Sequence, residues 1–261
     1  AIGAVRQTIS LRPDWDSTRT WLARLLLLDG QRESAFEQMA FALEMNPGLD
    51  LELEFVRLLA AADEQQAAQD RLERLTERYP GEPGVPLVQA ALFEQTGDVS
   101  AAEAIYIALL SRGLYRNECL WSLALIAFDR DDYEGAISLF GQSSSGERLE
   151  ASTLGASQAY LALDNVDAAL DVLADYAEFY PKRAWAMQQP QSQILAAVGR
   201  YYEALEKSTA ALDYSPWSSE LWLYRGGLLE EMQRMDEAVD AFRTAYELAP
   251  SDPLTLNAYG Y

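Results

Sequence analysis

A period of about 34 residues runs through the sequence, and it limits the fold more than any other feature. The segment 219–252 shows the unit clearly, with Gly226 at its eighth position, Ala238 at its twentieth and Pro250 at its thirty-second. Small residues at two such positions let two helices cross closely, and a proline cannot continue a helix. The unit therefore predicts an antiparallel helix pair. The proline after it recurs in five of the seven complete copies and is missing in the third and fourth.

The twentieth position is alanine in each of the seven complete copies. Together with Gly226, the predicted structural positions of the repeat are Ala35, Ala68, Ala102, Ala136, Ala169, Ala204 and Ala238. The complete copies cover residues 16–48, 49–82, 83–116, 117–149, 150–184, 185–218 and 219–252. Residues 1–15 match the end of an earlier copy, and residues 253–261 match the start of a later one. Since natural solenoids end in capping elements, we expect the sequence to be a fragment of a longer protein.

The unit resembles the tetratricopeptide repeat, a helix pair that stacks into helical solenoids. The resemblance covers almost the whole chain. It implies an all-α fold, a right-handed superhelical solenoid of seven complete helix pairs with partial repeats at both ends. It also implies one continuous domain over residues 1–261, because each repeat contacts only its neighbours. We expect a first helix within residues 1–10, seven pairs, and a short helix after Pro253.

Two copies depart from the pattern. The fourth copy ends early, at residues 141–146 with the sequence Gly-Gln-Ser-Ser-Ser-Gly, which predicts either a local loop or a hinge between two halves of the solenoid. The sixth copy carries Pro190 inside its first helix. Because proline inside a helix costs about 3 kcal/mol, we expect this helix to be short and to begin near Pro190.

The net charge of the chain is −21, and only Lys182 and Lys207 are lysines. Nucleic acids and anionic membranes bind basic surfaces, so the composition argues against both as partners. No stretch approaches 18 consecutive apolar residues, so we predict no transmembrane segment in this sequence. The acidic surface either steers basic partners toward the protein or is only a solvated exterior.

The sequence has few of the groups that catalysis and metal binding require. It contains no histidine, and Cys119 is its single cysteine, which we expect to be a half-buried, unreactive thiol. The adjacent carboxylates of Asp131–Asp132 and Glu230–Glu231 are expected to be solvated, because neighbouring side chains on a helix point about 100° apart and do not converge on one atom. We therefore predict no enzyme activity, no catalytic residue, no metal site and no cofactor.

The resemblance implies that the first helix of each pair lines a concave groove. The residues it places at the partner-binding positions are Trp21, Arg24, Arg57, Leu87, Trp121, Leu125, Phe128, Leu154, Gln158, Leu161, Leu223 and Tyr224. The lysines and asparagines with which some members clamp a terminal carboxylate are absent. The centre of the groove is instead an apolar strip formed by Trp121, Leu125 and Phe128. Either this strip is exposed and binds a helix or an apolar peptide, or it packs against the neighbouring first helix.

The last six residues, Leu256 to Tyr261, read LNAYGY. They resemble the LNALGY-type opening of repeats in bacterial outer-membrane lipoproteins, some of which are adaptors for periplasmic carboxyl-terminal processing proteases. This resemblance implies a scaffold that tethers a protease to its substrates. The alternative is a periplasmic scaffold in exopolysaccharide export or envelope assembly. The expected location is periplasmic and outer-membrane-anchored if the resemblance holds, and cytoplasmic otherwise.

Overall fold

The computed structural model describes residues 2–5, 16–143 and 148–260, and all regular structure in these residues is helical. The helices follow in pairs: α2 (Asp16–Leu28) and α3 (Arg32–Met45), α4 (Leu49–Ala61) and α5 (Gln65–Arg78), α6 (Gly84–Thr96) and α7 (Val99–Ser111), α8 (Arg116–Asp129) and α9 (Tyr133–Gly141), α10 (Leu149–Ala162) and α11 (Val166–Phe179), α12 (Trp185–Ala197) and α13 (Tyr201–Tyr214), α14 (Ser219–Glu231) and α15 (Met235–Leu248). A short 3-10 turn, η1 (Pro181–Arg183), precedes α12, and α16 (Pro253–Tyr259) follows α15. The prediction of an all-α fold built from helix pairs is confirmed.

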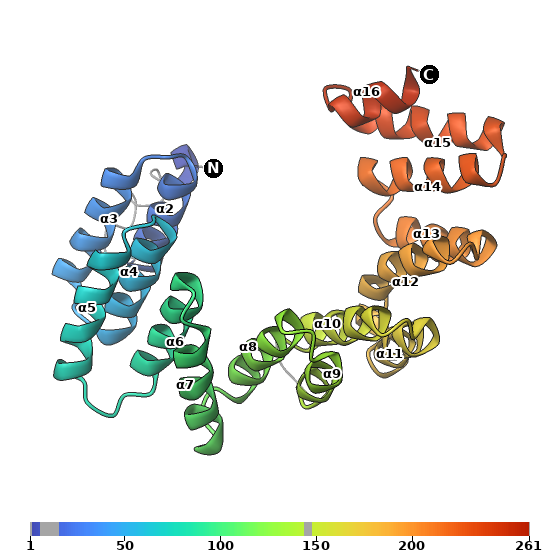
Figure 1. The fold of residues 1–261 in the computed structure, drawn as a ribbon. Helices are drawn as coiled ribbons and strands as arrows, with labels where there is room; N and C mark the ends of the chain where they lie inside the picture. Colours follow the sequence, from blue (N-terminus) through green and yellow to red (C-terminus); the bar gives the residue numbers. More distant parts are fainter. Residues whose placement is uncertain (1, 6–15, 144–147, 261) are drawn as a thin grey trace. The chain divides into compact units, whose positions relative to one another are not determined.

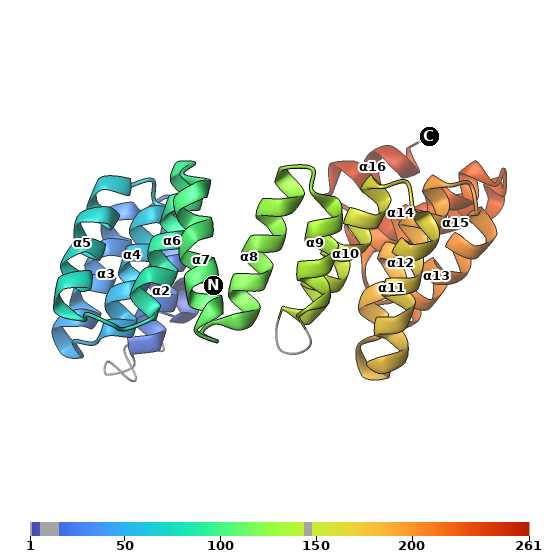
Figure 2. The same ribbon diagram turned by 60° about the horizontal axis from the view of Figure 1, so that its bottom comes forward.

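The chain forms two compact units, Ala1–Ile126 and Ala127–Tyr261. In unit 1, helices α2 to α7 stack pair upon pair, and Figures 1 and 2 show them side by side in both views. Their core holds fully buried side chains such as Leu26, Met39 and Val56. In unit 2, smaller clusters around Leu173, Leu195 and Leu229 join α10 to α15. The expectation of one continuous solenoid over the whole chain stays a prediction.

The turn inside each pair has the same backbone geometry. Its fifteenth repeat position lies in the left-handed region in every complete copy, with φ of +78° at Gly30, +65° at Asp63 and +85° at Gly97. Glycine adopts this conformation without strain, and aspartate tolerates it better than most residues. In the later copies the same position is taken by Asp131, Asp164, Gly199 and Gln233. The turn therefore fixes where the second helix of each pair begins.

The helix crossing is built from the small residues that define the repeat. All seven alanines at the twentieth position are buried, with at most 2% of their surface exposed. A Cβ atom added to Gly226 would collide with the ring of Phe242. Where the glycine position is serine, its hydroxyl crosses the contact: Ser157 Oγ donates to Ala169 O at 2.9 Å, and Ser192 Oγ donates to Ala204 O at 2.6 Å. The two helices of a pair are therefore held together at this crossing by the close approach of small residues and by hydrogen bonds, rather than by large side chains.

The sixth copy corrects one expectation. Helix α12 begins at Trp185 and contains Pro190 in its interior, so it starts five residues before the predicted point. The first turn is held by packing, because Met187 is fully buried and the Trp185 ring stacks on Tyr214 with centroids 4.4 Å apart. These contacts compensate for the hydrogen bond that Pro190 cannot make.

The fourth copy has the short second helix that its sequence suggests, because α9 ends at Gly141. The hinge and loop alternatives for residues 141–146 fall mostly outside the described residues. In the described part of the chain, no helix is long and apolar enough to cross a membrane.

Candidate partner-binding surface

In unit 1, the first helices of the first two pairs share an ion-pair network. Arg24 Nε donates to Glu54 Oε1 at 2.8 Å, and Arg57 Nη1 donates to Glu54 Oε2 at 3.4 Å. The bond between α2 and α4 brings the sixth and ninth positions of neighbouring repeats onto one face. The Glu54 side chain is 16% exposed, whereas those of Arg24 and Arg57 are 57% and 49% exposed. Trp21, one turn before Arg24, is 55% exposed, so an indole and two guanidinium groups lie open to solvent on these helices.

Helix α8 carries the central apolar strip. Leu120, Leu123 and Ala124 supply its buried side. Trp121 is half-buried, and Leu125, one turn further on, is 38% exposed. The core of α8 is therefore formed by residues other than Trp121 and Leu125.

The other predicted groove residues near this strip are partly used in packing. Leu87 on α6 is half-buried. Phe128, which belongs to unit 2, is half-buried and packs edge-on against Tyr133, with ring centroids 5.2 Å apart and planes at 73°. This contact is with α9, the second helix of the same pair, so the alternative of packing against the neighbouring first helix stays open for Phe128.

In unit 2, the predicted groove residues of α10 are also partly used in packing. Leu154 and Leu161 pack against a buried cluster that contains Met187 and Ile194 of α12, and both leucines are half-buried. Gln158, between them on the same helix, is exposed. The leucines therefore join neighbouring repeats, while the carboxamide faces solvent.

On α14, Leu223 and Tyr224 are half-buried. The hydroxyl of Tyr224 lies 3.2 Å from Ser192 Oγ on α12. Burial raises the pKa of the Tyr224 phenol, and the hydrogen bond to Ser192 opposes this only in part. Tyr224 therefore stays protonated at neutral pH and links two repeats of unit 2.

The groups considered for catalysis have structural roles. Asp131 accepts a hydrogen bond from Tyr133 Oη at 2.7 Å, and Asp132 caps α9 by accepting from the backbone N–H of Gly135 at 3.0 Å. Cys119 is fully buried rather than half-buried. It belongs to the buried residues of α8, together with Leu120 and Leu123. Burial raises the pKa of its thiol to about 11. Among the described residues, no group of three histidine, cysteine or acidic side chains is arranged to hold a metal ion.

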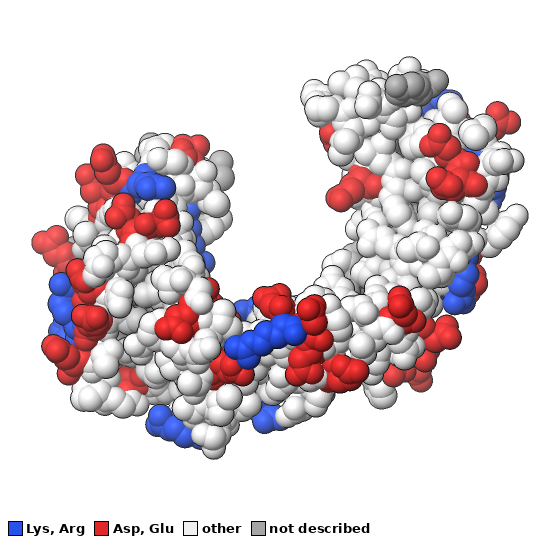
Figure 3. Space-filling view, in the orientation of Figure 1, with Lys and Arg blue, Asp and Glu red and all other residues white. Residues whose placement is uncertain are grey.

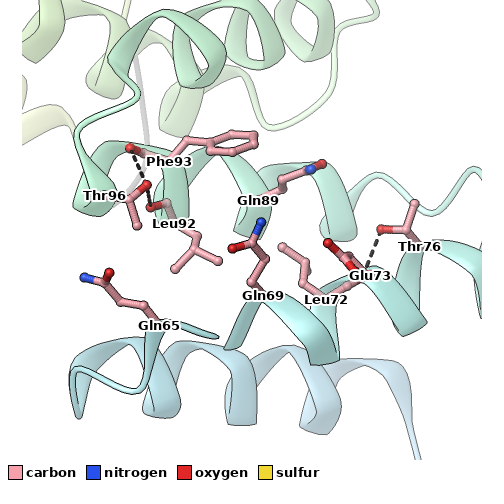
Figure 4. A pocket seen from close by; sticks show the side chains of 9 residues that line it. All are labelled: Gln65, Gln69, Leu72, Glu73, Thr76, Gln89, Leu92, Phe93 and Thr96. Atoms are coloured by element: carbon pink, nitrogen blue, oxygen red, sulfur yellow. Dashed lines mark hydrogen bonds between the residues drawn. The ribbon is translucent and has the colours of Figure 1, made fainter. Parts of the chain in front are cut away.

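A cleft between α5 and α6 was not among the predicted sites, because the repeat pattern assigns binding to the first helices alone. Its volume is about 60 Å³, which is space for about two water molecules. Figure 4 shows Gln69 and Gln89 approaching it from the two helices. The hydroxyls of Thr76 and Thr96 are satisfied by backbone oxygens of their own helices.

Stacked helix pairs that cross at small residues, with side chains presented on successive first helices, define a class of helical-repeat binding proteins. The family model described as "Tetratricopeptide repeat" matches residues 87–144 and 191–253. These two segments of the chain are tetratricopeptide repeats. Proteins of this kind are generally non-catalytic scaffolds that bind proteins or peptides.

Solved structures share the fold. The C-terminal part of a repeat-containing protein from Cytophaga hutchinsonii is 13% identical, with a TM-score of 0.61 over 92% of this chain and 98% of that one. PilF from Pseudomonas aeruginosa is 14% identical, with a TM-score of 0.56 over 81% of this chain and 94% of that one. A tetratricopeptide repeat protein from Parabacteroides merdae is 15% identical, with a TM-score of 0.54 over 94% and 97%. Such identities show the fold alone. A comparison with curated protein sequences found no significant match.

Proposed function

We propose that the chain is a non-catalytic scaffold that binds a partner protein or peptide along its first helices. The observation that carries this proposal is the composition of α8. Its buried residues include Leu120, Leu123 and Ala124, whereas Trp121 is half-buried and Leu125 is 38% exposed. Tryptophan is enriched among the residues that anchor protein interfaces.

The specific role that we propose is that of an adaptor. In this role the scaffold tethers a periplasmic protease to its substrates, and the whole protein is anchored in the outer membrane. The LNAYGY sequence at residues 256–261 supports this role. The first four of these residues lie on α16, after Pro253, where the repeat pattern places the start of a further pair.

The second candidate is a scaffold in exopolysaccharide export or envelope assembly. One observation favours it: the rings of Trp185 and Tyr214 stack nearly parallel, at 4° and 4.4 Å, and both are exposed. Sugar rings stack on aromatic faces of this kind.

The test is a pull-down from bacterial lysate with the purified chain and two variants. Trp121→Ala removes the proposed anchor, and Tyr202→Ala removes an aromatic side chain that is 81% exposed on α13. We expect a protein that is recovered by the wild type and by Tyr202→Ala, but depleted with Trp121→Ala. Equal recovery with both variants would reject the anchor. Recovery of a protease or a cell-wall hydrolase supports the adaptor, and recovery of polysaccharide machinery alone supports the second candidate.

A further inference from the structure

A second surface of unit 2 has the features of a binding site. A cleft of about 200 Å³ lies between α9, α10 and α11. None of the predicted groove residues lines it. The cleft is large enough for one side chain of a partner, and it is several times larger than the cleft between α5 and α6.

Two of the residues that line the cleft, Ser143 and Ser152, carry buried hydroxyl groups without partners. Ser143 is 3% exposed and Ser152 is 1% exposed, and the Oγ atom of each makes no hydrogen bond. The neighbouring Thr153 differs, because its hydroxyl donates to Leu149 O at 2.9 Å. Buried hydroxyls are nearly always paired in folded proteins. The two serines therefore offer oxygen atoms to a group that enters the cleft.

The walls and the mouth of the cleft add aromatic surface and negative charge. Phe140 is almost completely buried in the wall, whereas Phe179 and Tyr180 at the end of α11 are 76% and 40% exposed. Asp175, one turn before Phe179, also lines the cleft and is exposed. Aromatic faces attract cations, and carboxylate and hydroxyl oxygens accept hydrogen bonds from ammonium and guanidinium groups.

The charge around the cleft favours the same kind of ligand. Asp167, Asp171, Asp175 and Glu178 recur every three to four residues along α11, so they share one face of the helix. All four are exposed, and Figure 3 shows acidic side chains over the part of the surface where α11 lies. Asp167 lies near Arg200. Among the described residues, the carboxylates of Asp171, Asp175 and Glu178 have no basic partner.

We propose that this cleft binds a lysine or arginine side chain from a basic segment of a partner protein. The aliphatic stem packs between Phe140 and Phe179, and the charged group donates to the hydroxyl oxygens of Ser143 and Ser152. Asp175 pairs with the cation at the mouth, and the other carboxylates of α11 attract the basic residues that flank it. This surface is separate from the groove on the first helices.

The test uses a fluorescently labelled nonapeptide, (Ala-Lys-Ala)₃, and its counterpart with norleucine in place of lysine. Norleucine keeps the aliphatic stem and removes the charge. Anisotropy titrations measure the dissociation constant of each peptide for the wild-type chain. We expect the norleucine peptide to bind at least about 10-fold more weakly, because the charged group makes the strongest hydrogen bonds. Equal binding of both peptides would show an apolar pocket and overturn the proposal.

Three variants then locate the binding. Asp175→Asn and Ser152→Ala each remove one proposed partner of the cation, and each should weaken the lysine peptide about 5-fold or more. Asp213→Asn makes the same charge change as Asp175→Asn on the exposed end of α13, and it should weaken binding less than about 2-fold. If Asp213→Asn weakens binding as much as Asp175→Asn, the attraction is diffuse and the cleft is not the site. If Asp175→Asn and Ser152→Ala bind the lysine peptide as tightly as the wild type, the cleft is likewise not the site. Trp121→Ala should not affect this peptide, so a failure here is distinct from a failure of the groove proposal.

Discussion

At the scale of single residues, the repeat depends on how closely two helices approach at Gly226. The ring of Phe242 occupies the space that a side chain on Gly226 would need. The adjacent Gly227 has no atom within 4 Å of an added Cβ. Two neighbouring glycines of one helix therefore have opposite tolerance for substitution.

This contrast gives a matched pair of variants. Gly226→Leu should lower the free energy of unfolding by about 1–3 kcal/mol, because the new side chain overpacks the crossing. Gly227→Ala should raise it by about 0.5–1 kcal/mol, because alanine is the better helix former. Denaturant unfolding of both variants measures the two changes. A melting curve of Gly226→Leu that matches the wild type would show that the repeat register is wrong.

The reactivity of Cys119 tests burial at α8. Its thiol has a pKa of about 11 because it is desolvated, so below that pH it stays protonated in the folded chain. We expect negligible alkylation by iodoacetamide at pH 8 in the native protein, since the thiolate is the nucleophile, and rapid alkylation once the chain is unfolded in urea. Rapid labelling of the folded chain at pH 8 would contradict the buried position.

Residue-scale features also mark the limit of the sequence analysis. The family resemblance implies which residues face the groove, but it does not show whether Trp121 is exposed or packed. The cleft of Ser143 and Ser152 has no signal in the sequence, because the pairing of a serine hydroxyl depends on three helices that meet only in the folded chain. The groove residues could therefore be predicted before the structure was known, whereas the cleft could be found only in the folded chain.

At the scale of helices, most of the fold could be predicted, because the alanine at the twentieth position recurs in all seven complete copies with a nearly constant period, and a proline follows in five of them. The exception is α12, where a local rule about proline gave a start near Pro190. Tertiary contacts of Trp185 and Met187 hold the earlier turn in a helix. Local propensity is a weak prior where packing opposes it.

The caps of the second helices give a prediction at this scale. Asp98 caps α7 by accepting from the backbone N–H of Ala101 at 3.2 Å, while Glu64 at the equivalent point of α5 makes no such bond. Asp98→Ala should therefore lower the free energy of unfolding by about 1 kcal/mol, and Glu64→Ala should change it by no more than about 0.5 kcal/mol. Urea unfolding of both variants under the same conditions makes the comparison. Equal losses would show that the cap of α7 contributes nothing specific.

At the scale of the whole molecule, each unit carries exposed side chains that lie outside its buried core. Unit 1 presents Trp21 beside two arginines, and it carries the half-buried Trp121 with the exposed Leu125. Unit 2 presents an acidic helix with a cleft of about 200 Å³. Repeat proteins are stabilised mainly by contacts between neighbouring repeats, and the exposed Trp21 and Leu125 lie at the surface of unit 1. This distribution is typical of a scaffold that contacts its partners at several places.

The central claim is that Trp121 anchors a partner rather than packing the fold, and one paired measurement on Trp121→Ala tests it most directly. The measurement combines calorimetry with the recovered partner and denaturant unfolding of the same variant. We expect the binding free energy to weaken by about 2 kcal/mol or more, as at an interface hot spot. The loss of stability should be smaller than the roughly 3–5 kcal/mol that truncation of a fully buried tryptophan costs. Unchanged affinity together with the full loss of stability would show that Trp121 belongs to the core and would contradict the account.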